Sequence, residues 1–222
     1  MDNQVESNEL RKAVVWKAKR MSRRNILLIV FSVLISAFLI YILLTQKTGI
    51  EEYVNPPVQI DQIQHSMIEY EGKFGPVDMT LLAEYSISGV VRSKKNYQID
   101  TASMVSPMDL VLAWGNLNSE SVKNDITFSQ SGRWYYYHVK NNADVTLNDV
   151  MMQSSNTHII PENDSILKQL RKIKEKDLIE LKGYLVSVQL FEGETPWTSS
   201  LTRNDSGDKS CEIMYVTEVN IK

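Results

Sequence analysis

Hydroxyl, guanidinium and carboxylate side chains gather in residues 197–212, WTSSLTRNDSGDKSCE, the most polar part of the chain. Arg203 could supply a bidentate donor for an anion or a sugar, with the neighbouring hydroxyls orienting the ligand. Together with His158 from an earlier segment, these residues make a candidate polar or anion-binding cluster: His158, Ser199, Ser200, Arg203 and Asp205.

The same stretch also suits a long β-hairpin. Its expected parts are a strand over 197–202, a turn over 204–208 and a strand over 211–221, because Asn, Asp, Ser and Gly favour turns. The hairpin explains nearly all of these residues, so we give it the greater weight and keep the cluster as the alternative.

His158 precedes an apolar pair and a proline in SNTHIIP, residues 155–161, so we expect it to be partly buried. Cys211 and His158 could form a nucleophile–base pair if the fold brought them together. However, Cys211 opens an apolar strand, and cysteine is among the most buried residue types. We therefore assign no catalytic residue. The three histidines and one cysteine show no metal-ligand spacing, and we predict neither a metal site nor a cofactor.

The aromatic run WYYY, residues 134–137, would place Trp134 and Tyr136 on one face of a strand and the other two rings on the opposite face. We expect half of these rings in the core, and the candidate stacking rings for a base or a sugar are Trp134 and Tyr136. Residues 1–25 carry seven basic and three acidic side chains, which leaves 17 basic and 24 acidic ones for the rest. That acidic remainder has no basic stripe, so nucleic acid is disfavoured as a partner.

Residues 26–44, ILLIVFSVLISAFLIYILL, predict a transmembrane helix. The run contains 17 apolar residues, two serines and no charge, and as a helix it would span about 28 Å of the bilayer. It is longer than the apolar core of a cleaved signal peptide. Seven basic residues precede it and Lys47, Glu51 and Glu52 follow it. The positive-inside rule therefore predicts a cytoplasmic N-terminus and an extracytoplasmic C-terminal domain.

The chain then divides into a basic cytoplasmic tail (1–25), the membrane helix (26–44), a stalk and lead-in (45–78) and a β-rich extracytoplasmic domain (79–222). The stalk contains Asn55-Pro56-Pro57, which favours extended backbone, and the lead-in has a weakly helical period. Within the domain, β-branched and aromatic patterns predict strands, and capped apolar patterns predict helices over 107–114 and 165–174. The expected strands are 80–93, 126–129, 133–140, 145–152, 177–190 and 211–221.

Gly183 marks a change in the alternation of one long strand. Apolar residues stand at 179 and 181, and then at 184, 186, 188 and 190. Glycine permits the bulge or coil that such a change requires. Coiled strands are typical of small barrels, so we expect a partly open small β-barrel of the OB-like kind with one or two helices. A two-layer α+β sandwich is the alternative.

Four segments carry a resemblance: residues 106–115, 128–137, 155–161 and the stretch from 182 to 212. Over about residues 80–222 the sequence resembles an uncharacterised family of bacterial single-pass envelope-anchored proteins. The resemblance implies a recurrent bacterial module and carries neither an activity nor a role for any residue.

These patterns predict a single-pass envelope protein whose exported β-rich domain is a binding or assembly module. Its expected partners are the lipid bilayer and either other envelope proteins or cell-wall glycan. The alternative is a membrane-anchored hydrolase or transferase that uses His158, Arg203, Asp205 or Cys211. We favour the non-enzymatic function because residues able to do chemistry are few.

Overall fold

The computed structural model describes residues 22–45, 55–61, 63–64, 66–202 and 210–222. The chain divides into two compact units, residues 1–49 and 50–222. In the first unit, helix α2 (Arg23–Thr45) contains the predicted span of residues 26–44. Its segment Arg23–Ile40 is long and apolar enough to cross a membrane, and none of that segment is buried against protein.

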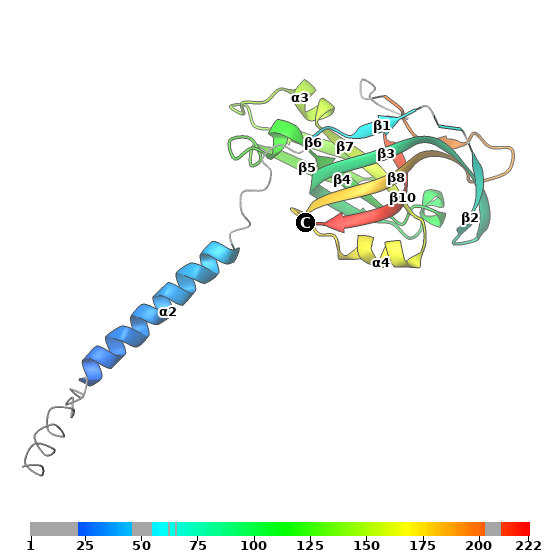
Figure 1. Cartoon of the computed structure of the whole chain (residues 1–222). Helices are drawn as coiled ribbons and strands as arrows, with labels where there is room; N and C mark the ends of the chain where they lie inside the picture. Colours follow the sequence, from blue (N-terminus) through cyan, green and yellow to red (C-terminus); the bar gives the residue numbers. More distant parts are fainter. Residues whose placement is uncertain (1–21, 46–54, 62, 65, 203–209) are drawn as a thin grey trace, which may run out of the picture. The chain divides into compact units, whose positions relative to one another are not determined.

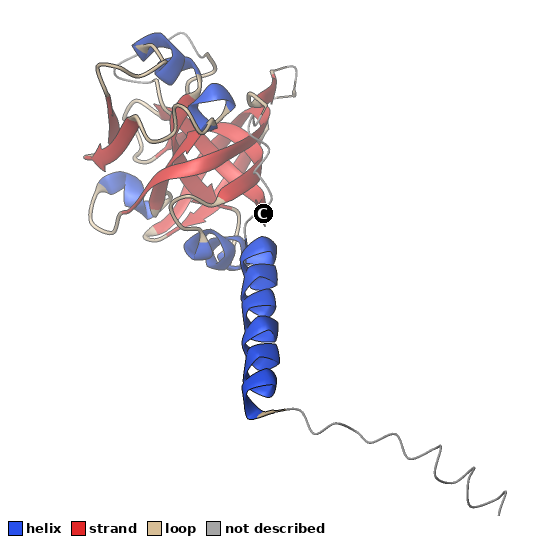
Figure 2. Ribbon diagram, turned by 90° about the vertical axis from the view of Figure 1, so that its left-hand side faces the viewer, coloured by secondary structure: helices blue, strands red, loops and turns tan. Residues whose placement is uncertain are grey.

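The second unit is a β-rich α+β fold (Figures 1 and 2). Eight strands form one sheet, and a separate hairpin pairs β5 (Ile126–Ser131) with β6 (Trp134–Val139). The strands of the large sheet are β1 (Val58–Ile60), β2 (Met67–Gly72), β3 (Gly75–Asn96), β4 (Met108–Ala113), β7 (Ser154–Pro161), β8 (Leu178–Gln189), β9 (Trp197–Thr198) and β10 (Glu212–Ile221). The helical elements are α3 (Leu147–Met152), α4 (Asp164–Lys172) and the 3₁₀ turns η1 (Thr101–Met104) and η2 (Gly115–Asn118).

Five strands of the large sheet pair in a closed order, in which the last strand pairs with the first. β3 pairs with β4, β4 with β7, β7 with β10, β10 with β8, and β8 again with β3. Only the β7–β10 pair among these five is parallel. β3 can pair on both sides because it is 22 residues long, with β8 along residues 78–90 and β4 along residues 90–96.

Two segments of the domain have a different secondary structure from the one that their sequence predicts. Residues 108–113 were expected within a helix and form β4, whose six residues are all buried. A strand buried on both faces is a continuous apolar run with no period of two, so it resembles a buried helix. Residues 145–152 were expected as a strand and contain helix α3, which begins with a capping box between Thr146 and Asp149.

Residues 59–78 contain strands where a weak helical period was expected. β1 and β2 both lie antiparallel to β3, which places this part of the chain in the large sheet. The predictions for β8, β10, the β5–β6 hairpin and α4 agree with the structure to within a few residues. Asn163, rather than Asp164, is the N-cap of α4, since its side chain accepts from the backbone N–H groups of Ser165 and Ile166.

The change of parity at Gly183 arises from two packed faces of β8. Leu181 and Leu185 lie in the main core cluster, whereas Val186 and Val188 belong to a second cluster. The pairings of β8 shift register on both neighbours, on β10 between Val216 and Glu218 and on β3 between Leu81 and Ala83. A Cβ at Gly183 would lie 1.9 Å from the carbonyl oxygen of Tyr215. Glycine is therefore required because β10 approaches the backbone of β8 closely.

Candidate functional site

A cavity of about 300 Å³ lies where four sequence-distant segments meet. The β5–β6 turn contributes Arg133 and Trp134, and β7 contributes His158. The segment 195–198, which includes β9, forms another wall, and Cys211 and Ile213 line the cavity at the start of β10. This volume is at the lower end of the range of about 300–1,000 Å³ that small-molecule sites occupy.

Arg133 fixes the hairpin to the rest of the unit by using all five of its side-chain N–H groups. It donates in bidentate fashion to Asp100, with Nε–Oδ2 3.1 Å and Nη2–Oδ1 2.8 Å. Nη2 also donates to the carbonyl oxygen of Ser106 (2.8 Å), and Nη1 donates to Ser106 Oγ (3.2 Å) and to Asp109 Oδ1 (2.7 Å). Because a guanidinium has five donors, Arg133 has none left for a ligand.

The backbone of the turn explains how Arg133 reaches these partners. Gly132 and Arg133 both have positive φ, 59° and 72°, and stand between the paired residues Ser131 and Trp134. Positive φ at both central residues is the geometry of a tight two-residue hairpin. An arginine in this conformation is strained, and its ion pairs hold it there. The guanidinium also stacks on the ring of Tyr97, 3.8 Å from the centroid.

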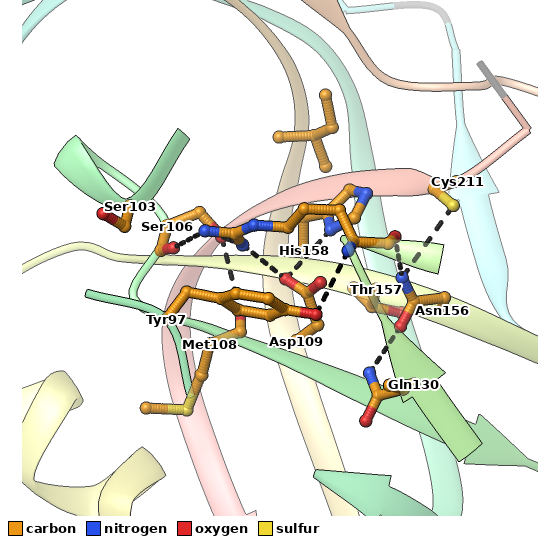
Figure 3. Close-up of polar contacts among 12 residues, drawn as sticks. Tyr97, Ser103, Ser106, Met108, Asp109, Gln130, Asn156, Thr157, His158 and Cys211 are labelled. Carbon is orange, nitrogen blue, oxygen red and sulfur yellow. Dashed lines mark hydrogen bonds and ion pairs between the residues drawn. The ribbon is translucent and has the colours of Figure 1, made fainter. Parts of the chain in front are cut away.

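Asp109 and His158 form a buried pair across two strands. β4 and β7 place these residues opposite one another, and His158 Nδ1 lies 2.9 Å from Asp109 Oδ1 (Figure 3). The Asp109 side chain is fully buried and that of His158 is 5% exposed. The contact turns the other imidazole nitrogen, Nε2, away from Asp109, and the ring packs against Trp197 with 4.9 Å between centroids. The imidazole that lines the cavity therefore faces Asp109 with Nδ1, at ion-pair distance but without hydrogen-bond geometry.

Asn156 connects the hairpin, β7 and the thiol. Its Nδ2 donates to the carbonyl oxygen of Arg133 at 3.0 Å and lies 3.9 Å from Cys211 Sγ, while its Oδ1 accepts from Gln130 at 2.8 Å (Figure 3). Cys211 is half-buried at the cavity wall. The amide of Asn156 thus holds the backbone of Arg133 beside the segment that carries Cys211.

The cavity contains some of the residues that the sequence singled out. His158, Trp134 and Cys211 line it. Tyr136 is 55% exposed on the same strand as Trp134 and does not line the cavity. The alternation predicted for residues 134–137 agrees with the burial pattern, in which Tyr135 and Tyr137 are the more buried pair.

The remaining predicted residues lie elsewhere or outside the described part of the chain. Ser199 Oγ accepts from the backbone N–H of Ile213 (3.0 Å) and donates to the carbonyl oxygen of Ser200 (2.9 Å). Ser200 Oγ donates to the carbonyl oxygen of Thr202. These two hydroxyls hold the segment after β9 in place. Arg203 and Asp205 lie outside the described residues, as does the turn predicted over 204–208. The strand predicted over 197–202 is only two residues long, and β9 pairs with β8 rather than forming a hairpin with β10.

Sequence reasoning missed Asp100, Asp109 and Asn156. Asp109 stood in a predicted helix, where nothing required a partner for its charge. A carboxylate inside a fully buried strand, by contrast, must be paired. An acid within the apolar run MDLVLA was therefore the available signal. Within the described residues, no three His, Cys, Asp or Glu side chains are grouped to hold a metal ion.

Two tyrosine side chains in residues 50–222 are expected to lose their phenolic protons only at a pH well above the ordinary value. Burial, the main cause, raises the pKa of Tyr135 to about 12 and that of Tyr70 to about 12. Since both folded pKa values exceed the unfolded value of about 10, the stability that these phenols contribute is complete below about pH 10 and is lost as pH rises towards about 12.

Tyr135→Phe should therefore shift alkaline unfolding, followed by near-ultraviolet circular dichroism, to higher pH. The same change at the exposed Tyr136 is the control, and equal shifts in both variants would contradict the expectation.

Comparison with known proteins yields no relative for this chain. No family model matches the sequence, and neither a curated protein nor a solved structure matches it significantly.

Proposed function

We propose that this chain is a single-pass protein of the cell envelope, anchored by α2, with its N-terminus in the cytoplasm and residues 50–222 outside. The support is the apolar helix and the seven basic residues that precede it, against Lys47, Glu51 and Glu52 after it.

The topology has a direct test. Alkaline phosphatase fused after Lys222 is expected to be active and β-galactosidase at the same position inactive, because the basic flank stays in the cytoplasm. Both reporters fused after residue 22 serve as the cytoplasmic control. An active β-galactosidase after Lys222 would reverse the proposed orientation.

We further propose that the ring of five paired strands is a partly open small barrel of the OB-like kind. Its strand order, β3-β4-β7-β10-β8, supports this assignment, as do the parallel β7–β10 pair and helix α4 between β7 and β8. OB folds bind oligomeric ligands on the face of their second and third strands and in adjacent loops. The corresponding strands here are β4 and β7, which carry Asp109 and His158. This part of the proposal rests on analogy of fold.

The exported unit is, in this proposal, a binding module whose site is the cavity. The observation that carries the proposal is the pair of indoles, Trp134 and Trp197, beside a histidine that faces a buried carboxylate. Aromatic walls with a few fixed polar groups are typical of ligand sites. The chain would thus hold an envelope component close to the membrane.

Photo-crosslinking in intact cells tests the location of the site. A benzophenone amino acid replaces Trp134 in one full-length variant and Tyr136 in a second, and a third combines the 134 replacement with Cys211→Ala. Adducts at 134 that persist without the thiol and are absent at 136 would support a binding site at the cavity. Equal labelling at both positions, or none at 134, would contradict it.

A thiol-dependent hydrolase or transferase is the second candidate, because Cys211 and His158, which faces Asp109, line one cavity. In that case His158 would act as the base for the Cys211 thiol. Iodoacetamide should then alkylate Cys211 in the full chain faster than it alkylates glutathione at neutral pH, and His158→Gln should remove the difference. Alkylation no faster than that of glutathione would rule out this candidate.

A further inference from the structure

We infer that the cavity binds a neutral hydroxylated ring, a sugar residue of a glycan. This inference rests on the proposed binding function of the cavity and names the class of its ligand. It depends on three properties of the lining: its charge, its aromatic surface and its available hydrogen-bonding nitrogen.

The charges at the cavity are already paired within the protein. Arg133 is the only charged residue of the described lining besides His158, which is charged only when protonated, and all its N–H groups have protein acceptors. Asp109, behind His158, accepts from Arg133. An anion would find no unused arginine donor, and a cation would meet the guanidinium at the wall. A neutral ligand avoids both costs, since leaving a charge in the cavity unpaired is expensive.

Two indole rings provide the apolar contact. Trp197 packs on His158, and Trp134 lines the cavity while remaining 40% exposed. A flat, partly exposed indole can bury the apolar C–H face of a sugar ring at little cost in rotamer freedom. Trp134 is held in place by the neighbouring Arg133, which fixes the turn. The backbone of the turn that carries Trp134 is therefore fixed before any ligand arrives, which lowers the entropic cost of binding.

His158 supplies the polar contact. Its side chain is 5% exposed, Nδ1 lies 2.9 Å from Asp109 Oδ1, and the described residues give neither ring nitrogen a hydrogen bond. In a neutral imidazole one ring nitrogen is an acceptor. A sugar hydroxyl is a donor that satisfies it, whereas a proline-rich peptide, the other ligand suited to an aromatic groove, presents prolines that have no N–H group.

The cavity size indicates how much of the ligand is held. At about 300 Å³ it holds a short part of an oligomer, while the rest of the chain extends into solvent. For a domain that is tethered to a membrane, this suits recognition of a terminal or internal sugar of an envelope glycan.

Titration of the full-length protein in a sugar-free zwitterionic detergent tests the inference. The probes are neutral tetramers of glucose and of N-acetylglucosamine, an acidic tetramer of galacturonate and a proline-rich peptide. Binding is followed by tryptophan fluorescence and by calorimetry. We expect saturable binding of at least one neutral tetramer, about tenfold or more weaker in Trp134→Ala and in His158→Gln. The matched control, Tyr136→Ala, removes an exposed ring from the same strand outside the cavity and should leave affinity unchanged.

The possible results distinguish failure of the neutral-sugar inference from failure of the proposed binding site. Binding of only the acidic tetramer or the peptide, weakened by Trp134→Ala, would overturn the neutral-sugar inference and leave the proposed binding site intact. Binding of a neutral tetramer that is equally strong in Trp134→Ala would place the sugar outside the cavity and overturn the inference. If no probe binds but crosslinking at position 134 gives adducts, the sugar inference is wrong and the binding function stands. If crosslinking also fails, both are wrong.

Discussion

Gly183→Ala is expected to destabilise the β-rich unit by about 3–5 kcal/mol, among the largest effects of any single substitution. The added Cβ would lie 1.9 Å from the carbonyl oxygen of Tyr215 and 3.1 Å from the Cα of Val216. All of these atoms belong to the backbone of β10, so no side chain can rotate away to relieve the clash. Either β8 or β10 must move, and both contribute to the core.

Thermal unfolding of the full-length protein, followed by near-ultraviolet circular dichroism, measures this effect. For a chain of this size, a loss of about 3–5 kcal/mol lowers Tm by about 6–20 °C. Gly75→Ala is the matched control: Gly75 also has a positive φ, +122°, but a Cβ there meets no atom within 4 Å. Its expected cost is about 1–2 kcal/mol, from backbone strain alone. Equal losses in the two variants would show that contact with β10 does not matter.

Asp109→Ala is expected to have a comparable effect for an electrostatic reason. The carboxylate is fully buried and lies within 2.9 Å of both Arg133 Nη1 and His158 Nδ1. Arg133 keeps Asp100 as a partner, but its Nη1 and the buried His158 Nδ1 lose their acidic neighbour, and breaking a buried pair costs about 3–5 kcal/mol. The β5–β6 hairpin should loosen as a result, because Arg133 loses a partner on β4. Trp134 should then become more accessible to quenchers.

Asp100→Ala is the control for Asp109, because it removes another acidic partner of the same arginine. Asp100 is 39% exposed, so its ion pair with Arg133 is partly screened by water. It also caps the η1 turn by accepting from the backbone N–H of Ser103, and we expect a combined cost of about 1–2 kcal/mol. Tm and iodide quenching of tryptophan fluorescence are compared in both variants. A larger loss in Asp100→Ala than in Asp109→Ala would contradict the role given to the buried pair.

Arg133→Met combined with Asp109→Leu separates the cost of a broken pair from the value of the pair. Because burial of two charges is costly, an apolar pair of similar size should recover much of the stability that Asp109→Ala loses. The double variant should nevertheless bind ligand less well, since a methionine side chain at position 133 makes none of the hydrogen bonds that fix the turn carrying Trp134.

Local sequence patterns were sufficient to predict the helices and strands that bury only one face, and those whose ends carry capping or turn residues. The apolar run at 26–44, the stripe of α4, the alternation of β8 and β10 and the glycine of the β5–β6 turn each express a period or a stop signal over a few residues. Gly183 belongs with them, although the cause of its requirement differs from the one expected. The break in the apolar alternation at Gly183 was visible in the local sequence. The close approach of the Tyr215 carbonyl to Gly183 was not.

The tertiary structure decided β4, α3 and the composition of the site. A strand buried on both faces has no polar face to reveal its period, so β4 could not be told from a helix before its neighbours β3 and β7 were known. The site depends on contacts over long sequence separations: Asp109 meets His158 because β4 pairs with β7, and Arg133 reaches both acids because the hairpin folds back on that sheet. Residue types and spacing pointed to Trp134 by itself and to His158 and Cys211 as a pair only if the fold brought them together. Only strand pairing brought them to one cavity, because pairing register is set by burial of the whole sheet rather than by any short segment.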